Sequence, residues 1–445
     1  MSSNKLQWIL AAIVPVICLV QFSPEAGVTQ ESAFLPGATS HGHHQIELQC
    51  SACHSDDMGL RPNACTDCHQ AELKRANDSH PKAKFLDPRN ADRVEILDAR
   101  NCVTCHREHS PETTLEMGLT LPADYCFFCH QDIEEDRPTH KGLPFDSCST
   151  AGCHNYHDNT ALYEDFLEQH LNDKPFAEDP RKLPKNHYHG WSEENRRQPL
   201  GASDRDSPDD VAFTQSVVYD WSLSAHAKAG VNCSDCHEPE GAAFVEKPGF
   251  AACQSCHDYE TETFLESMHG MRLAAGLSPM TPALAEIPMH QSAAHKELSC
   301  VACHDAHSSD VQFASRQACI SCHDSEHVNN YRGSLHAELW TKELAGEGPP
   351  DSGVSCATCH FPRVERNEFG EVSNRVLHNQ NETLRPNEKM IRPVCLQCHG
   401  LGFAIDALAD QDLIRSNFQG RPQVHVESLE MVEEKLRRLQ SERSP

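Results

Sequence analysis

The cysteines of this 445-residue chain follow one repeated pattern, and this pattern constrains the fold more than any other feature. All of the 23 cysteines except Cys18 fall into pairs, and a histidine directly follows the second cysteine of every pair. Ten pairs read CxxCH, whereas CSTAGCH at 148–154 has four residues between its cysteines. The same chemistry therefore recurs eleven times along the chain. The paired cysteines are Cys50 and Cys53, Cys65 and Cys68, Cys102 and Cys105, Cys126 and Cys129, Cys148 and Cys153, Cys233 and Cys236, Cys253 and Cys256, Cys300 and Cys303, Cys319 and Cys322, Cys356 and Cys359, and Cys395 and Cys398.

This spacing is the attachment signature of c-type haem. Two thiols add across the two vinyl groups of one porphyrin, and the histidine after the second cysteine lies beneath the iron as proximal ligand. Structural zinc and disulfides are the alternatives, but neither gives a role to a histidine after every second cysteine. The sequence therefore predicts eleven covalently bound haem c groups. Their predicted proximal ligands are His54, His69, His106, His130, His154, His237, His257, His304, His323, His360 and His399.

The composition agrees with an interior filled by cofactor. Hydrophobic residues make up 38% and aromatic residues 6% of the chain, which would build only a thin core at this length. Porphyrins would fill much of that interior instead. Apolar residues at helical spacing occur at 161–171 and at 424–443. We expect a mainly α fold with much coil, a haem-packed core and little or no β-sheet.

The attachment sites form two groups, five within 50–154 and six within 233–399, separated by a stretch rich in proline and charge. Before them, the apolar run at 6–22 resembles the core of a secretory signal and is short for a spanning helix. No clean cleavage site follows, so a removed signal and an uncleaved membrane anchor both stay open. Either way we expect export to the periplasmic or extracellular side. The predicted parts are a signal peptide or N-terminal anchor (1–26), a pentahaem domain (41–171), a linker (172–215), a hexahaem domain (216–423), and a C-terminal helix and tail (424–445).

The sixth iron ligands decide between electron transfer and catalysis. Two histidines saturate an iron and suit outer-sphere electron transfer, whereas a missing sixth ligand opens a catalytic position. Of the 30 histidines, 11 belong to the motifs, so 19 remain for eleven irons. For each, the alternative is a solvated or hydrogen-bonded imidazole. The candidates are His41, His44, His80, His109, His140, His157, His170, His226, His269, His290, His295, His307, His327, His336 and His378; His43 lies in the same HGHH segment as His41 and His44, and His187, His189 and His425 are less favoured.

Four of these candidates lie three or four residues beyond a motif histidine. A side chain so close stays on the proximal side of its own porphyrin. We therefore expect these four to reach a neighbouring haem and to link the haems into a chain. They are His109, His157, His307 and His327.

Two family resemblances can be stated from these motifs. Residues 41–171, with HGHH ahead of CSACH and with the CxxxxCH site, resemble class III multihaem cytochromes. Residues 216–405 resemble the group of cytochrome c-554 and the octahaem hydroxylamine oxidoreductases. The segments that carry the second resemblance are SMHG (267–270), CVACHDAH (300–307), GVSCATCHFPR (353–363) and VCLQCHGLGF (394–403). The chain lacks the CxxCK site of ammonia-forming nitrite reductases, and no tyrosine matches the haem-bonded tyrosine of hydroxylamine oxidoreductases.

The leading hypothesis is an exported electron-transfer protein whose haems form a wire between redox partners. The partners would be a membrane quinol-oxidising complex or soluble cytochromes, and the protein would tune each haem through spacing, ligands and dielectric. The net charge of −28 makes nucleic acid and anionic membrane surfaces poor partners.

Two other functions stay open. One is an oxidoreductase with an open-site haem that acts on a small nitrogen or sulfur compound such as hydroxylamine, nitrite or tetrathionate. In that case Arg272, His290 and His295 of the segment 270–299 would bind anions or transfer protons; alternatively, His290 or His295 ligates a haem and the segment only packs. The other is an oligomer or haem filament, or docking in a membrane complex through residues 6–22.

Overall fold

The computed structural model describes two long stretches of the chain, residues 35–137 and 197–426, with short gaps at 116–117, 123, 210, 212, 239–242, 369–370 and 385–386. It also describes short pieces at 140, 155–158, 166, 169–170, 172–177, 430, 433–434, 437 and 441. The apolar run at 6–22, the CSTAGCH site, His187 and His189 lie outside these residues, and so does most of the helices expected at 161–171 and 424–443.

The chain divides into two compact units. The first comprises the described residues up to Gln70 together with Pro81–Pro122, and the second comprises Ala71–His80 and the described residues from Ala123 onward. Much of the linker expected at 172–215 lies outside the described residues, and its described ends are held in place. Phe176 forms an isolated β-bridge with His399, and Arg197 forms an ion pair with Asp235 at 2.6 Å.

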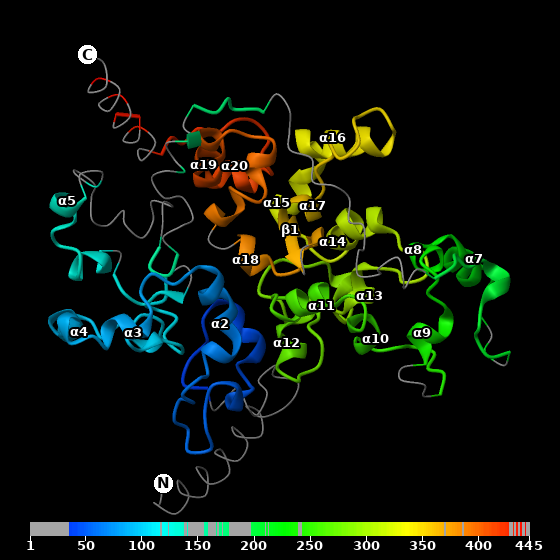
Figure 1. Ribbon diagram of the computed structural model, residues 1–445, viewed down its shortest axis with the longest axis horizontal. Helices are drawn as coiled ribbons and strands as arrows, with labels where there is room; N and C mark the ends of the chain where they lie inside the picture. Colours follow the sequence, from blue (N-terminus) through cyan, green and yellow to red (C-terminus); the bar gives the residue numbers. More distant parts are fainter. Residues whose placement is uncertain are drawn as a thin grey trace, which may run out of the picture. The chain divides into compact units, whose positions relative to one another are not determined.

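The first unit contains short helices and turns (Figure 1). Its α-helices are α3 (Lys82–Phe85) and α4 (Ala91–Ile96), and α2 (Thr66–Arg75) begins in it. Its 3₁₀ helices are η3 (His41–Ile46), η4 (Cys50–Ala52), η5 (Pro88–Asn90) and η6 (Cys102–Thr104).

The second unit is also built from short helices. Its α-helices are α5 (Ile133–Asp136), α7 (Gln215–Leu223), α8 (Ala225–Lys228), α9 (Cys233–His237), α10 (Ala251–Gln254), α11 (Asp258–Leu265), α12 (Met271–Ala274), α13 (Cys300–Cys303), α14 (Ala318–Ile320), α15 (Glu326–Asn330), α16 (Leu335–Leu344), α17 (Cys356–His360), α18 (Gln380–Leu384), α19 (Leu401–Ala409) and α20 (Gln411–Arg415). Its 3₁₀ helices are η8 (Tyr125–Phe128), η12 (Ala202–Asp204), η14 (Pro282–Leu284), η15 (Gln291–Ala293), η17 (Tyr331–Gly333), η18 (Asn387–Met390) and η19 (Cys395–Gln397), and η16 (Phe313–Gln317) is a π-helix.

Side-chain caps start many of these helices. Thr214, Ser224, Ser325, Ser334 and Asp410 each accept a backbone N–H of the first turn of the helix that follows. Such caps satisfy donors that a short helix would otherwise leave unpaired. Local side chains therefore define these helices even where the apolar face is small.

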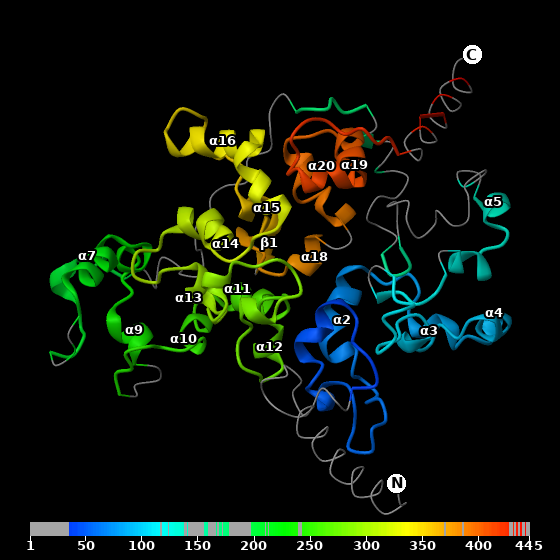
Figure 2. The ribbon, with the colours of Figure 1, turned by 180° about the vertical axis from the view of Figure 1, so that it is seen from behind.

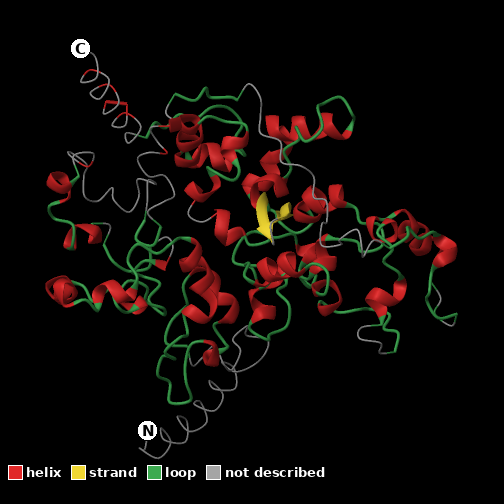
Figure 3. Ribbon diagram, viewed as in Figure 1, coloured by secondary structure: helices red, strands yellow, loops and turns green. Residues whose placement is uncertain are grey.

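A single antiparallel hairpin is the sheet of the described residues. Its strands are β1 (Arg363–Glu368) and β2 (Glu371–Val376), and the register pairs Arg363 with Val376 and Glu368 with Glu371. Figures 2 and 3 show this hairpin among the short helices of the second unit. The prediction of a mainly α fold with much coil and little sheet is confirmed.

The side-chain core of the second unit is small. Met390, Ile391, Leu401, Ala404 and Leu408 form a buried cluster, in which Ile391 is 1% and Leu401 0% exposed. Because this cluster is built mainly by α19 and the segment before it, it anchors the end of the chain that carries the last CxxCH motif. In the part of the chain that the structure describes, no helix has both the length and the apolar content needed to span a membrane.

Candidate haem sites

The described motifs each form one helical turn. The backbone N–H of the motif histidine donates to the carbonyl of the first cysteine, at 2.8 Å from His54 to Cys50 and at 2.9 Å from His304 to Cys300. Residues three apart lie on the same face of a helical turn. The turn therefore directs both cysteines of a CxxC pair to one side, as attachment to a single porphyrin edge requires.

Eight motif histidines each face a second imidazole from elsewhere in the chain. Metal–imidazole nitrogen bonds are about 2 Å long, so two imidazoles on opposite sides of one iron hold their ring centroids about 6 Å apart. The facing pairs have this separation. They are His69 with His43 (5.9 Å), His130 with His80 (6.1 Å), His237 with His307 (6.2 Å), His257 with His226 (6.1 Å), His304 with His378 (6.2 Å), His323 with His269 (6.1 Å), His360 with His327 (6.2 Å), and His399 with His336 (6.3 Å).

Hydrogen bonds at Nδ1 leave the lone pair of Nε2 for an iron, and at His327 this Nε2 atom lies 3.2 Å from Nδ2 of Asn417. The Nδ1 atoms of His80, His226, His237, His327 and His378 lie 2.5–3.1 Å from the backbone carbonyls of Tyr156, Ala306, Val245, Ile414 and Val376, respectively. A carbonyl can only accept, so Nδ1 must carry the proton and Nε2 must keep its lone pair. This is the tautomer and the outer hydrogen bond that metal-ligating histidines have.

His269 reaches the same tautomer through an amide. The Nε2 atom of Gln380 is placed 3.0 Å from Nδ1 of His269, while the buried Oε1 atom of Gln380 has no hydrogen-bond partner among the described residues. Exchanging the two amide atoms lets Nδ1–H donate to Oε1, because the positions of amide O and N are an assignment. The exchange satisfies the orphaned oxygen and leaves Nε2 of His269 directed at the space before His323.

Burial keeps several facing imidazoles neutral. Burial, and after it the charge of neighbouring imidazoles, lower the pKa of His269, His304, His336 and His360 to about 4. A neutral imidazole is the form that binds a metal. The donor set of two cysteines, a neutral motif histidine and a second imidazole therefore fits a six-coordinate haem c.

Successive motifs lie beside one another. Thiols of first cysteines are hydrogen-bonded across motifs, Cys65 with Cys102, Cys253 with Cys300, and Cys319 with Cys356. Burial and then the neighbouring Cys253 thiol raise the pKa of Cys236 to about 11. Burial and then the nearby Cys359 thiol raise the pKa of Cys395 to about 12. These attachment sites thus adjoin the next one along the chain within each unit.

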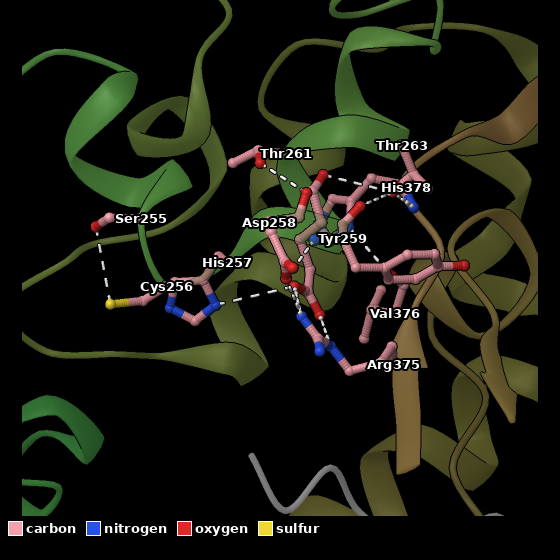
Figure 4. A network of polar contacts seen from close by, with 11 residues as sticks. Ser255, Cys256, His257, Asp258, Tyr259, Thr261, Thr263, Arg375, Val376 and His378 are labelled. Atoms are coloured by element: carbon pink, nitrogen blue, oxygen red, sulfur yellow. Dashed lines mark hydrogen bonds and ion pairs between the residues drawn. The ribbon is translucent and has the colours of Figure 1, made fainter. Parts of the chain in front are cut away.

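A polar network centred on the largely buried Arg375 and Glu260 joins two of these sites (Figure 4). Glu260 of α11 lies 4.0 Å from Nδ1 of His257, and Arg375 of β2 binds the Glu260 carboxylate and, at 3.2 Å, Asp258. His378 follows β2, and its backbone N–H donates to Thr263 of α11 at 3.2 Å. The hairpin and α11 therefore hold one imidazole of the His257 pair and one of the His304 pair in fixed relation.

Seven of the predicted sixth ligands occupy facing positions: His80, His226, His269, His307, His327, His336 and His378. His307 and His327 face the histidines of other motifs, His237 and His360. This agrees with the expectation that a histidine so close to its own motif reaches a neighbouring haem. The eighth facing position, opposite His69, is held by His43 of the HGHH segment. The predictions for His41 and His44 stay predictions. His41, His43 and His44 all lie in the short 3₁₀ helix η3, so sequence alone does not show which of them faces a given motif histidine.

Other predicted ligands have different contacts. Nδ1 of His109 lies 2.8 Å from the carbonyl of Gly37, Nδ1 of His170 lies 2.8 Å from Asp173, and Nδ1 of His290 lies 3.5 Å from Asp324. His295 is exposed. Among the described residues, none of these four faces a motif histidine, and none faces His54.

His140 and His157 also lie within the described residues. The backbone N–H of His140 donates to the carbonyl of Arg137 at 2.9 Å, and Nδ1 of His157 lies 3.3 Å from Asp78. His106 directs Nδ1 at the carbonyl of Gly118. The side chain of His41 and the motif histidine His154 lie outside the described part.

Within the segment 270–299, neither His290 nor His295 faces a motif histidine. Arg272 donates through Nε to the carbonyl of Ser278 at 3.0 Å. All six motif histidines between 233 and 399 face a second imidazole. In this part of the described chain, no observation favours the oxidoreductase hypothesis.

Comparison with known proteins gives one family. Residues 41–131 and 225–324 match the cytochrome c3 family. The second of these segments lies in the half that resembled the cytochrome c-554 and hydroxylamine oxidoreductase group, and the comparison does not show that resemblance. No curated protein matches the chain.

Proposed function

We propose that this multihaem c-type cytochrome transfers electrons between redox partners along a chain of eleven covalently bound haems. The observation that carries the proposal is the set of eight facing imidazole pairs with centroid separations of 5.9–6.3 Å. When bound, haem c supplies a one-electron iron centre. An iron held by two histidines has no free position for a substrate and suits outer-sphere transfer.

The protein's own residues would have three tasks in this function. The paired cysteines would hold each porphyrin by thioether bonds, and the motif histidine and its facing imidazole would bind the iron. The backbone carbonyls at Nδ1 of His80, His226, His237, His327 and His378 would keep these ligands in the required tautomer and orientation. The cross-motif cysteine contacts, such as Cys253 with Cys300, would place successive haems side by side.

The setting of the protein is part of the same proposal. Export to the periplasmic or extracellular side fits the apolar run at 6–22, which would act as a signal peptide or as a membrane anchor. The pentahaem (41–171) and hexahaem (216–423) domains would each hold a section of the wire. The donor and acceptor would be a membrane quinol-oxidising complex or soluble cytochromes. With a net charge of −28, electrostatic complementarity favours a partner with a basic docking face.

Spectroscopy of the purified holoprotein tests the proposal. The absorbance of the alkaline pyridine complex gives the number of haems per chain, and addition of CO to the dithionite-reduced protein titrates open ferrous positions. We expect eleven haems and a low-spin spectrum in which the eight sites with facing imidazoles bind no CO. More than three CO molecules per chain would contradict the assignment of these eight pairs.

A further inference from the structure

Glu108 lies against one axial imidazole of the first unit. Its Oε1 atom is 2.8 Å from Nδ1 of His43, whose ring faces His69. Ser40 holds the same carboxylate from the other side, through its backbone N–H to Oε2 and its hydroxyl to Oε1, both at 2.6 Å. Three donors therefore converge on Glu108, and one of them belongs to a facing histidine.

This contact differs from those of the other facing histidines. At His226, His327 and His378 the oxygen next to Nδ1 is a neutral backbone carbonyl, and at His80 a carbonyl and the Ser79 hydroxyl lie there. The carboxylates nearest His257 and His307 lie 4.0 Å away, beyond hydrogen-bonding distance. His43, with a carboxylate at Nδ1, therefore differs from His226, His327 and His378, whose Nδ1 atoms meet backbone carbonyls.

The charge of Glu108 is also poorly neutralised. No lysine or arginine of the described residues forms an ion pair with it, whereas Glu260 near His257 is bound by Arg375.

We infer that Glu108 is a positioning residue that lowers the reduction potential of the haem held between His43 and His69. A carboxylate that accepts Nδ1–H increases the electron donation of the imidazole through Nε2, and this stabilises the ferric iron. The same bond fixes the orientation of the His43 ring. The inference rests on the proposed function, because it requires His43 and His69 to bind the iron.

The test is a redox titration of the full-length holoprotein carrying Glu108→Gln, followed by visible absorbance and by the EPR signals of the low-spin ferric haems. Glutamine keeps the size and an accepting oxygen but removes the charge. We expect one haem to become easier to reduce by about tenfold in its reduction equilibrium constant, which is about 59 mV for one electron. Its EPR signal should shift while the haem stays low-spin.

Glu112→Gln is the matched control, because Glu112 is exposed and lies four residues further along the same segment. It removes the same charge without touching an imidazole, so its titration should match the wild type. Glu108→Asp serves if the glutamine variant does not fold: it keeps the charge but withdraws the oxygen from Nδ1, and we expect a shift in the same direction of smaller size.

Failure of the inference on Glu108 can be distinguished from failure of the proposed electron-transfer function. If the variants keep all haems low-spin and titrate as the wild type does, the role of Glu108 is overturned and the electron-transfer function stands. If the wild-type haem attached at Cys65 and Cys68 is high-spin and binds CO, the ligation by His43 and His69 fails, and the proposed function fails at that site.

Discussion

Arg375 on β2 and Glu260 on α11 form a two-pronged ion pair, with Nε 2.8 Å from Oε1 and Nη2 2.6 Å from Oε2. The side chains are 9% and 18% exposed. The pair connects the helix that follows His257 to the strand that precedes His378. A contact between residues 115 positions apart thus holds the ligand-bearing segments of two neighbouring sites together.

Replacing Arg375 by glutamine should strongly destabilise the second unit. The substitution leaves the mostly buried Glu260 carboxylate without its cation, and breaking a buried pair in this way costs about 3 kcal/mol. Urea unfolding of the holoprotein, followed by far-ultraviolet circular dichroism, measures the loss. Arg363→Gln is the control, because Arg363 on β1 pairs with Asp351 at 3.6 Å near the surface, and such pairs contribute less than about 1 kcal/mol. Equal losses for the two variants would contradict the role of the Arg375 pair.

Removing a facing imidazole should open one iron. His307→Ala deletes the half-buried partner of His237 and leaves the CSDCH motif (233–237) intact. We expect one haem to change from low-spin to high-spin and to bind one additional CO per chain after reduction. His295→Ala, at an exposed position without a facing motif histidine, should bind no more CO than the wild type. A low-spin His307→Ala spectrum would show that another group binds this iron.

Gly270 should be needed to position His269, the predicted iron ligand that directly precedes it. A Cβ atom at this position would fall on the carbonyl oxygen of Phe264 and lie 2.9 Å from Cα of Leu265, and this backbone cannot move without moving His269. Gly270→Ala should therefore weaken or abolish the low-spin state of the haem between His269 and His323. Gly249→Ala is a matched control, because a Cβ atom there meets nothing within 4 Å. EPR of both oxidised variants compares them, and identical spectra would refute the constraint.

Asp410 should give α20 a stability that depends on pH. Its carboxylate accepts the backbone N–H groups of Gln423 (2.8 Å) and Leu413 (2.9 Å), and these bonds lower the pKa of Asp410 below its usual 3.8. Since the folded pKa is the lower one, the stabilisation is complete above the unfolded pKa and is lost as the pH falls through the folded pKa.

Asp410→Ala should thus unfold more easily than the wild type at neutral pH, and the difference should disappear as the pH falls below 3.8. Unfolding midpoints across this range measure it. Asp412→Ala, in the same helix and exposed, is the control for the loss of a charge. A wild-type advantage that persists at the acid end would rule out the carboxylate as its source.

Peptide mass mapping should find a haem on every motif. We expect each tryptic peptide to be heavier by one haem for every motif that it contains, including one for CSTAGCH at 148–154. The peptide that ends at Lys74 and the peptide 229–272 each hold two motifs, because Pro62 and Pro248 block cleavage after Arg61 and Lys247. Where the mature protein retains Cys18, its tryptic peptide also holds the motifs at 50–54 and 65–69, and it should carry two haems and no third. An unmodified peptide with CSTAGCH would reduce the number of haems to ten and show that this motif does not attach a haem.

Local sequence determined the attachment chemistry and the class of fold. In CxxCH the two cysteines and the histidine fall on one helical turn, as the hydrogen bond from His304 to Cys300 illustrates, so their arrangement needs no distant residue. The low apolar content likewise predicts short helices and coil around a cofactor, which the structure has. The hairpin of β1 and β2 was not predicted, because its residues are largely charged and its strands are held by pairing and by the buried Arg375.

Tertiary structure alone decided which second imidazole belongs to each motif. The partners are separated by between 26 positions (43 to 69) and 74 positions (304 to 378), and the facing histidine precedes the motif in some pairs and follows it in others. No local pattern records such a pairing, because it depends on how distant segments pack. For the same reason the sequence did not reveal that Glu108 contacts His43 and that Arg375 contacts Glu260. These long-range contacts, rather than the motifs, distinguish one site from another.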